Sequence, residues 1–332
     1  MVMERNPLYD RAKGIGMILV IYGHMFDYGG IPFSIIFSFH MPLFFIISGM
    51  LLLPERIHNV KMSTWIRNCI KRYFAPFVFF LVLGCVTRLL YSGCFSTKEV
   101  LYQIFYYIGS NELFMGALWF IGALMVAMIL MPIIIRLGGA KIITQLFALF
   151  ILIISSFLFS KLPIVLPFRI KIMSGVLFFV YFGFLFKEKI ISSIYNKLIM
   201  KCTYFGLPIF LVLSIMNKTI NISEPVYNDG LIFLLCAVYG TFFVLSISTY
   251  RMPRFIEYLG KNSLIVFSLH AIWIFIFTDV LNRILGTSYA PMVDMPLHYV
   301  LLGGVIVIIM TSLSTMLVLP VYNATLKVLK LK

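Results

Sequence analysis

The chain has 332 residues, of which 61% are hydrophobic and only 12% are charged, and its mean hydropathy is +1.02. Soluble proteins carry about 25% charged residues, so this composition excludes an ordinary soluble enzyme. The net charge of +15 does not indicate nucleic acid, because most basic residues lie at the ends of apolar segments. We therefore expect an integral membrane protein whose basic residues meet anionic membrane lipid.

Apolar segments follow one another along the whole chain, and most are long enough to cross a ~30 Å hydrocarbon core as helices. They predict an all-α integral membrane protein with about ten transmembrane helices in a single bundle, formed by one domain over residues 1–332. The expected spans are residues 13–29, 32–53, 73–91, 115–135, 141–160, 170–187, 202–217, 230–249, 262–280 and 298–320.

The distribution of lysine and arginine tests this count, since cytoplasmic segments are enriched in both residues. With both termini in the cytoplasm, 20 of the 27 Lys and Arg residues fall in cytoplasmic segments. A missed span would scramble this alternation. We therefore predict a multi-pass protein of the cell (inner) membrane with cytoplasmic N- and C-termini.

Ionisable residues inside a bilayer are costly, so each one is a candidate for function. His24 lies in KGIGMILVIYGH, eleven residues after Lys13. At 1.5 Å per residue it stands about 16 Å above the lysine, on the same helix face. Asp10 lies one turn before Lys13, close to the same stripe, and we expect its carboxylate to hold the lysine.

The second span carries His40 in the segment SFHMPLFFIISGM. A very short outer loop between antiparallel helices brings His24 and His40 to similar depth. Pro42 removes a backbone hydrogen bond and is typical of a kink, and freed backbone in a membrane faces protein or a water-filled cavity. Further along, Ser48 and Gly49 would admit a close neighbour.

Three other positions have weaker signals. His270 lies in the ninth span, with Ser268 on a different face of the same helix, and a lone transmembrane histidine commonly bonds to a neighbouring helix. Trp119 lies just inside the fourth span, where an interfacial aromatic belt explains it equally well. We expect His58 and His298 at the surface.

The second cytoplasmic loop ends in a basic group that includes Arg67, Lys71 and Arg72. The enrichment of cytoplasmic loops in basic residues alone predicts such a group. A phosphate-rich ligand would also bind there, with arginine suited to bidentate contacts. The five cysteines show no metal-ligand or redox spacing, and we expect no metal.

Several segments together form a pattern that resembles a known family. DRAKGIGMILVIYGH followed by SFHMPLFFIISGM has a basic residue, ten intervening positions and a histidine, then PLFF and SG. This opening resembles the acyltransferase-3 family, especially its fucose 4-O-acetylase-like branch, in the short form without a soluble C-terminal domain. RNCIKRYFAP, LWFIGAL and LGKNSLIVFSLH resemble its looser later signatures. Many members have arginine where this chain has Lys13, which lacks the planar fork of donors.

The resemblance implies a membrane O-acyltransferase. Its acetyl group would come from cytoplasmic acetyl-CoA, the co-substrate, and go to a hydroxyl of a cell-surface polysaccharide or its lipid-linked sugar precursor. His24 would act as the general base or as an acyl carrier, and His40 would orient it or stabilise an oxyanion. The expected CoA-binding residues are Lys13, Arg67, Lys71 and Arg72, and the expected supporting residues are Asp10, Ser48, Trp119, Ser268 and His270.

Two other classes of function remain as alternatives. A transporter or flippase of a lipid-linked sugar also has polar groups at mid-membrane and a broken helix, although this chain shows no paired repeats with matching interruptions. A membrane scaffold without chemistry would not explain Lys13 and His24 on one helix face. Turnover of acetyl-CoA by the purified protein separates the enzyme from both alternatives.

Overall fold

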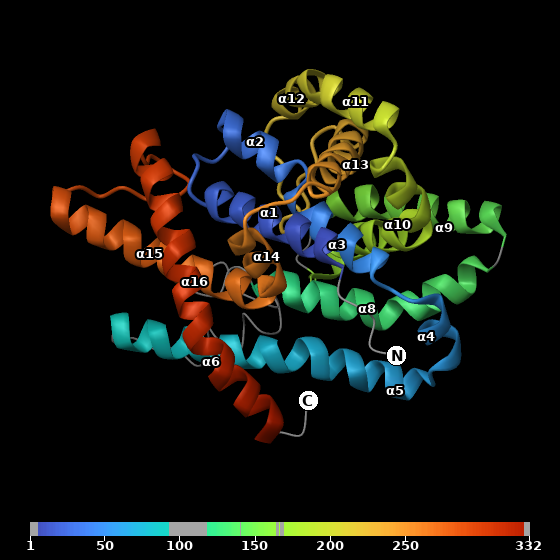
Figure 1. Ribbon diagram of the computed structural model, residues 1–332, viewed down its shortest axis with the longest axis horizontal. Helices are drawn as coiled ribbons and strands as arrows, with labels where there is room; N and C mark the ends of the chain where they lie inside the picture. Colours follow the sequence, from blue (N-terminus) through green and yellow to red (C-terminus); the bar gives the residue numbers. More distant parts are fainter. Residues whose placement is uncertain (1–5, 93–117, 140, 164–165, 167–168, 329–332) are drawn as a thin grey trace. The chain divides into compact units, whose positions relative to one another are not determined.

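The computed structural model describes residues 6–92, 118–139, 141–163, 166 and 169–328, and Figure 1 shows that its regular structure is helical. An isolated bridge between Asn221 and Val226 is the β pairing within these ranges. The helices are α1 (Pro7–Gly23), α2 (Ile31–Phe37), α3 (His40–Met50), α4 (Pro54–Asn59), α5 (Met62–Cys69), η1 (Ile70–Phe74), α6 (Ala75–Ser92), α8 (Trp119–Gly138), α9 (Ile142–Ser160), α10 (Ile170–Ile194), α11 (Lys197–Phe205), α12 (Leu207–Met216), α13 (Gly230–Ile247), α14 (Arg254–Lys261), α15 (Ser263–Leu285) and α16 (Leu297–Val328).

The chain forms two compact units. The first unit comprises residues 1–47, 185–222 and 226–315, and the second comprises residues 48–184, 223–225 and 316–332. The helices α3, α10 and α16 contribute residues to both. Each unit is considered by itself below.

Eight helices within the described ranges are long and apolar enough to cross a membrane. The count becomes nine if α11 and α12, which meet at a bend of 43°, form one span. The chain is therefore a multi-pass membrane protein. The expected count of about ten stays a prediction, because α1, which covers much of the first expected span, has only 17 residues. The cytoplasmic location of the two termini also stays a prediction.

The first helix begins and ends earlier than the expected span of residues 13–29. It begins at Pro7, whose fixed φ suits a first turn, after Asn6, whose side chain accepts a hydrogen bond from the Leu8 amide at 3.0 Å. It ends at Gly23, before a turn in which Gly29 has a φ of +81°. His24 consequently caps the C-terminal end of α1 rather than lying inside the helix.

The expected second span is divided into α2 and α3 by a break at Ser38 and Phe39. Pro42 explains the position of the break. A proline lacks the amide hydrogen that would bond to the carbonyl four residues earlier, and its ring clashes with that carbonyl, which here belongs to Ser38. The break lies before the proline, and His40 becomes the first residue of α3.

A close contact between α1 and α14 holds the core of the first unit together (Figure 1). A Cβ atom at Gly14 would overlap the carbonyl oxygen of Ile256, and one at Gly260 would overlap that of Asp10. Arg11 adds an ion pair to Glu257 at 2.8 Å. The two backbones can approach this closely only because both positions are glycine.

In the second unit, α5, η1 and α6 form one long helix from Met62 to Ser92 with a π-helical turn over residues 70–74. The Trp65 side chain donates a hydrogen bond to the Met128 carbonyl on α8 at 2.8 Å. Gly49 on α3 lies against α10, because a Cβ there would overlap the Val180 carbonyl. These contacts fix how α8 and α10 pack within this unit.

Candidate active site

Three histidines from three helices come together in the first unit. The ring of His24, at the end of α1, lies 5.1 Å from that of His270 on α15, measured between centroids. Phe37, the last residue of α2, lies 5.8 Å from His24 and 4.6 Å from His40. The cluster therefore runs from His270 through His24 and Phe37 to His40.

All three imidazoles are anchored in the same way. The Nδ1 atoms of His24, His40 and His270 lie 2.8, 2.9 and 2.7 Å from the carbonyl oxygens of Val20, Ile36 and Phe267. A carbonyl oxygen only accepts hydrogen bonds, so Nδ1 must carry the proton and donate. In a neutral ring this leaves Nε2 with a lone pair, on the edge of the ring away from its own helix.

The three histidines differ in exposure. His24 is partly exposed, whereas His40 is 2% exposed and His270 is fully buried. Nε2 of His270 has no hydrogen-bond partner among the described residues. A buried polar atom without a partner is rare in a folded protein, and a catalytic role is one explanation for it. His24 is thus the least buried member of the cluster, with His270 against it.

Small residues let the surrounding helices meet at the cluster. Gly23 lies against α2, and a Cβ there would sit 3.0 Å from Ile36 and 3.1 Å from Phe37. Gly240 on α13 leaves room for the ring of Phe39 at the break between α2 and α3. Because the break is packed against α13, His40 is held at a defined place.

Asp10 and Lys13 form an ion pair at the N-terminal end of α1. The Lys13 Nζ atom lies 3.1 Å from Oδ1 of Asp10, and the Asp10 side chain is 9% exposed. The expectation that Asp10 holds Lys13 agrees with this geometry. The pair lies about 16 Å along α1 from His24 by helical rise.

Five other expected site residues belong to the second unit, namely Ser48, Arg67, Lys71, Arg72 and Trp119. Arg67 lies in α5, and Lys71 and Arg72 lie in the π-helical turn, where the Arg72 guanidinium stands 5.6 Å from the ring centre of Tyr73. Trp119 opens α8 and is 8% exposed, with the Arg169 guanidinium 5.9 Å from its ring. Such burial is more typical of a packing residue than of an aromatic belt at a lipid interface.

The comparisons with known proteins agree with the resemblance noted above. The family model described as "Acyltransferase domain", that of the acyltransferase-3 family, matches residues 6–315. The chain belongs to the acyltransferase-3 family. No curated protein and no solved structure gives a significant match.

As a membrane acyltransferase, the protein needs a group that activates a nucleophile, and its histidine cluster contains three imidazoles.

Within the described ranges, no group of three His, Cys, Asp or Glu side chains has a geometry that could hold a metal ion. His58 and His298 are exposed, as expected. The Ser268 hydroxyl donates to the Leu264 carbonyl of its own helix at 2.9 Å.

The sequence places His270 among the supporting residues and favours contact with a neighbouring helix. The structure places its ring edge-on against His24 of α1. Spacing along one helix cannot reveal a contact across 246 positions of the chain. The available signal was the segment LGKNSLIVFSLH, in which Gly260 packs against α1 and His270 follows ten residues later.

Proposed function

We propose that this acyltransferase is an O-acetyltransferase that moves an acetyl group from cytoplasmic acetyl-CoA to a hydroxyl of a cell-surface polysaccharide or its lipid-linked sugar precursor. The observation that carries the proposal is the cluster of three histidines, in which His24 is the least buried residue and its Nδ1 is hydrogen-bonded, so that Nε2 keeps the lone pair of the neutral ring. A sugar hydroxyl is a poor nucleophile at neutral pH and needs such a base.

In the direct route, Nε2 of His24 takes the proton of the acceptor hydroxyl while the hydroxyl oxygen attacks the thioester carbonyl carbon. The new carbon–oxygen bond forms, the carbon–sulfur bond breaks, and the proton passes from His24 to the CoA thiolate. The products are the acetyl ester and free CoA. A positioned base of this kind contributes about 10²- to 10⁴-fold to the rate.

The neighbouring histidines have separate roles in this proposal. When His24 takes the proton, its Nε2 becomes a donor, and Nε2 of His270, in the ring 5.1 Å away, would accept the hydrogen bond. That hydrogen bond stabilises the positive charge on His24. His40 lies behind Phe37 and holds the other side of the cluster, or stabilises the oxyanion through a bound water.

A second route uses the same residue as a nucleophile. Nε2 of His24 attacks the thioester, CoA leaves as the thiolate, and the acetyl group stays on the imidazole until the acceptor hydroxyl takes it. This route suits a donor and an acceptor on opposite sides of the membrane. If this route operates, acetyl-CoA without acceptor should give a burst of CoA release that is close to one equivalent of the enzyme.

For the donor, we propose that Lys13, Arg67 and Arg72 attract the phosphates of CoA. Lysine and arginine are the residues that bind phosphate through charge-assisted hydrogen bonds. The ion pair with Asp10 at 3.1 Å keeps Lys13 extended along α1, so that its charge stays near one place. Lys71 belongs to the same basic group and lines a separate groove described below.

The proposed function is tested by the O-acetyl content of surface glycans, measured by NMR in a strain lacking the gene and in that strain carrying the wild-type gene. We expect O-acetyl signals to fall in the deletion strain and to return on complementation. Purified protein should also release CoA from acetyl-CoA when given the glycan. Unchanged acetylation in the deletion strain would rule out a glycan as the acceptor.

We also predict that His270→Ala lowers kcat by about fivefold to tenfold, since a hydrogen bond is worth about 1 kcal/mol. KM for acetyl-CoA should not change, because His270 contacts His24 and not the donor. His270→Gln should recover part of the loss, since its amide oxygen accepts a hydrogen bond. Steady-state kinetics on the purified variants measure this.

The matched control is Thr278→Val on the same helix. The buried Thr278 hydroxyl donates to the Ile274 carbonyl at 2.8 Å, so its loss perturbs α15 without touching His24. An equal loss in both variants, or a rise in KM without a fall in kcat, would assign His270 a structural role only.

A further inference from the structure

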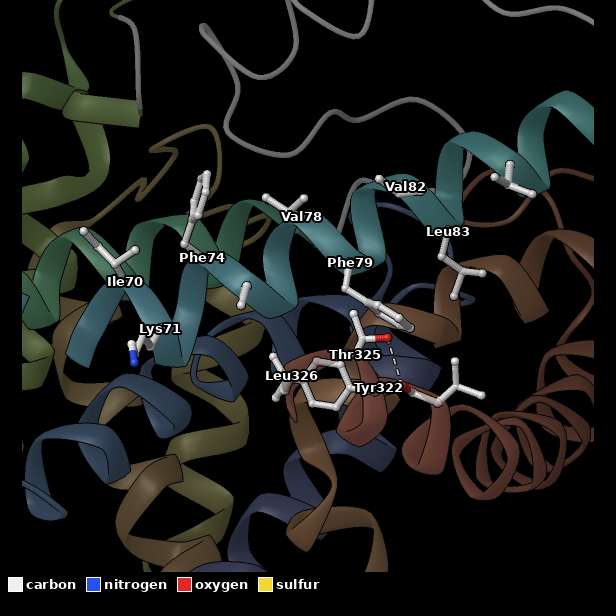
Figure 2. A pocket seen from close by; sticks show the side chains of 13 residues that line it. Ile70, Lys71, Phe74, Val78, Phe79, Val82, Leu83, Tyr322, Thr325 and Leu326 are labelled. Atoms are coloured by element: carbon white, nitrogen blue, oxygen red, sulfur yellow. Dashed lines mark hydrogen bonds between the residues drawn. The ribbon is translucent and has the colours of Figure 1, made fainter. Parts of the chain in front are cut away.

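A groove with a volume of about 600 Å³ lies in the second unit between the long helix of η1 and α6 and the last turns of α16. Figure 2 shows its lining, with Lys71 on one wall and Tyr322 on the other. The Thr325 hydroxyl donates to its own helix at the Val321 carbonyl, 2.9 Å away. The walls therefore present almost only hydrocarbon and aromatic surface.

The two walls differ in length. On the long helix, the lining residues recur every third or fourth position from Ile70 to Val86, so they form one apolar stripe about 24 Å long by helical rise. The wall from α16 covers only residues 321–326, about 8 Å.

Lys71 supplies the one charge among the described residues that line the groove. It lies in the π-helical turn beside Arg72 and one turn after Arg67. On the predicted topology this end faces the cytoplasmic leaflet, which is rich in anionic lipid. The groove thus joins an apolar channel to a basic end.

We propose that this groove holds one acyl chain of an anionic phospholipid, with the lipid phosphate against the Lys71 ammonium. Both walls belong to helices apolar enough to span a membrane, so lipid is the medium in which the groove forms. The groove residues Val82 and Val321 are 55% and 59% exposed, so their side chains can contact the acyl chain of the lipid. The proposal does not depend on the acceptor or on the histidine chemistry.

Native mass spectrometry of the full-length protein tests the proposal. The protein is stripped of lipid in detergent and then given equal amounts of phosphatidylglycerol and phosphatidylcholine with identical chains. We expect the wild type to retain phosphatidylglycerol about fivefold more than phosphatidylcholine, because a lysine favours the anionic headgroup over the zwitterionic one by about 1 kcal/mol. Lys71→Gln should abolish that preference, whereas Lys61→Gln, which changes an exposed lysine of the preceding loop, should keep it.

Substitutions that fill the groove test whether the lipid acyl chain binds there. Val321→Trp and Val82→Trp should each lower retention of both lipids at least fivefold from opposite walls. Val305→Trp is the matched control, because Val305 is 49% exposed on the same helix as Val321 but does not line the groove. An unchanged preference in Lys71→Gln, or equal retention in the groove and control variants, would overturn the proposal. Displacement of phosphatidylglycerol by an equal amount of polyprenyl phosphate would show that the groove binds a polyprenyl lipid rather than a phospholipid, and would overturn the proposal.

Discussion

The His24→Ala variant is expected to lose at least about 100-fold of its acetyl-transfer rate, the contribution of a positioned general base. His24 is the partly exposed member of the histidine cluster, so both proposed routes pass through its Nε2 atom. In a deletion strain complemented at matched protein levels, O-acetyl signals should return with the wild type and not with this variant. Single-turnover release of CoA from the purified protein gives the rate itself.

His58→Ala is the control for this variant, because His58 is an exposed histidine of the second unit. Its activity should equal that of the wild type. The loss in His24→Ala should not come with a loss of folded protein, since among the described residues the hydrogen bond of the imidazole goes to the carbonyl of Val20 at the end of its own helix. Full acetyl transfer by His24→Ala would leave the family assignment intact and remove His24 from both routes.

The second large effect is expected on stability, at the contact between α1 and α14. Gly260→Ala places a Cβ onto the Asp10 carbonyl, and Gly14→Ala places one onto the Ile256 carbonyl. Alanine otherwise favours a helix over glycine by about 1 kcal/mol. The overlaps involve backbone, which cannot rotate away, so we expect a net destabilisation near 3 kcal/mol, the upper end for overpacked cores.

Thermal unfolding in detergent measures this loss of stability. Gly206→Ala provides the comparison within the same unit, because its Cβ would meet the edge of the Tyr239 ring at 3.1 Å, and a side chain can move a few tenths of an ångström. It should unfold close to the wild-type temperature. If Gly260→Ala also did so, the close approach of α1 and α14 would be wrong.

Much of this architecture follows from the sequence, because membrane helices are long and apolar throughout. Each of the ten expected spans overlaps a helix, and Pro42 correctly indicated a disturbed second span, although the break lies four residues earlier, at the carbonyl that the proline leaves without a donor. The first span was placed about six residues too late, since its apolar residues continue beyond Gly23 into a turn. Apolarity alone does not show where a helix stops.

The candidate site was harder to predict, because its parts lie far apart in the chain. The placement of His24 and His40 on either side of Phe37 is compatible with the short connection between their helices. The approach of His270 depends on α14 and α15 packing against α1, which in turn requires Gly14 and Gly260. No periodicity within one helix reports such a pair of glycines, and the π-helical turn at residues 70–74 has no comparable signal either.

The bonds that anchor the three imidazoles have a consequence for how such a site persists through descent. Each ring takes its orientation from a carbonyl only three or four positions earlier in its own segment. The orientation of each ring is therefore determined within its own segment of five residues or fewer. Apolar residues elsewhere in the bundle can therefore be substituted without changing the orientation of the three rings, provided that the three helices still meet. Most of the sequence can then diverge while the histidine cluster keeps its geometry.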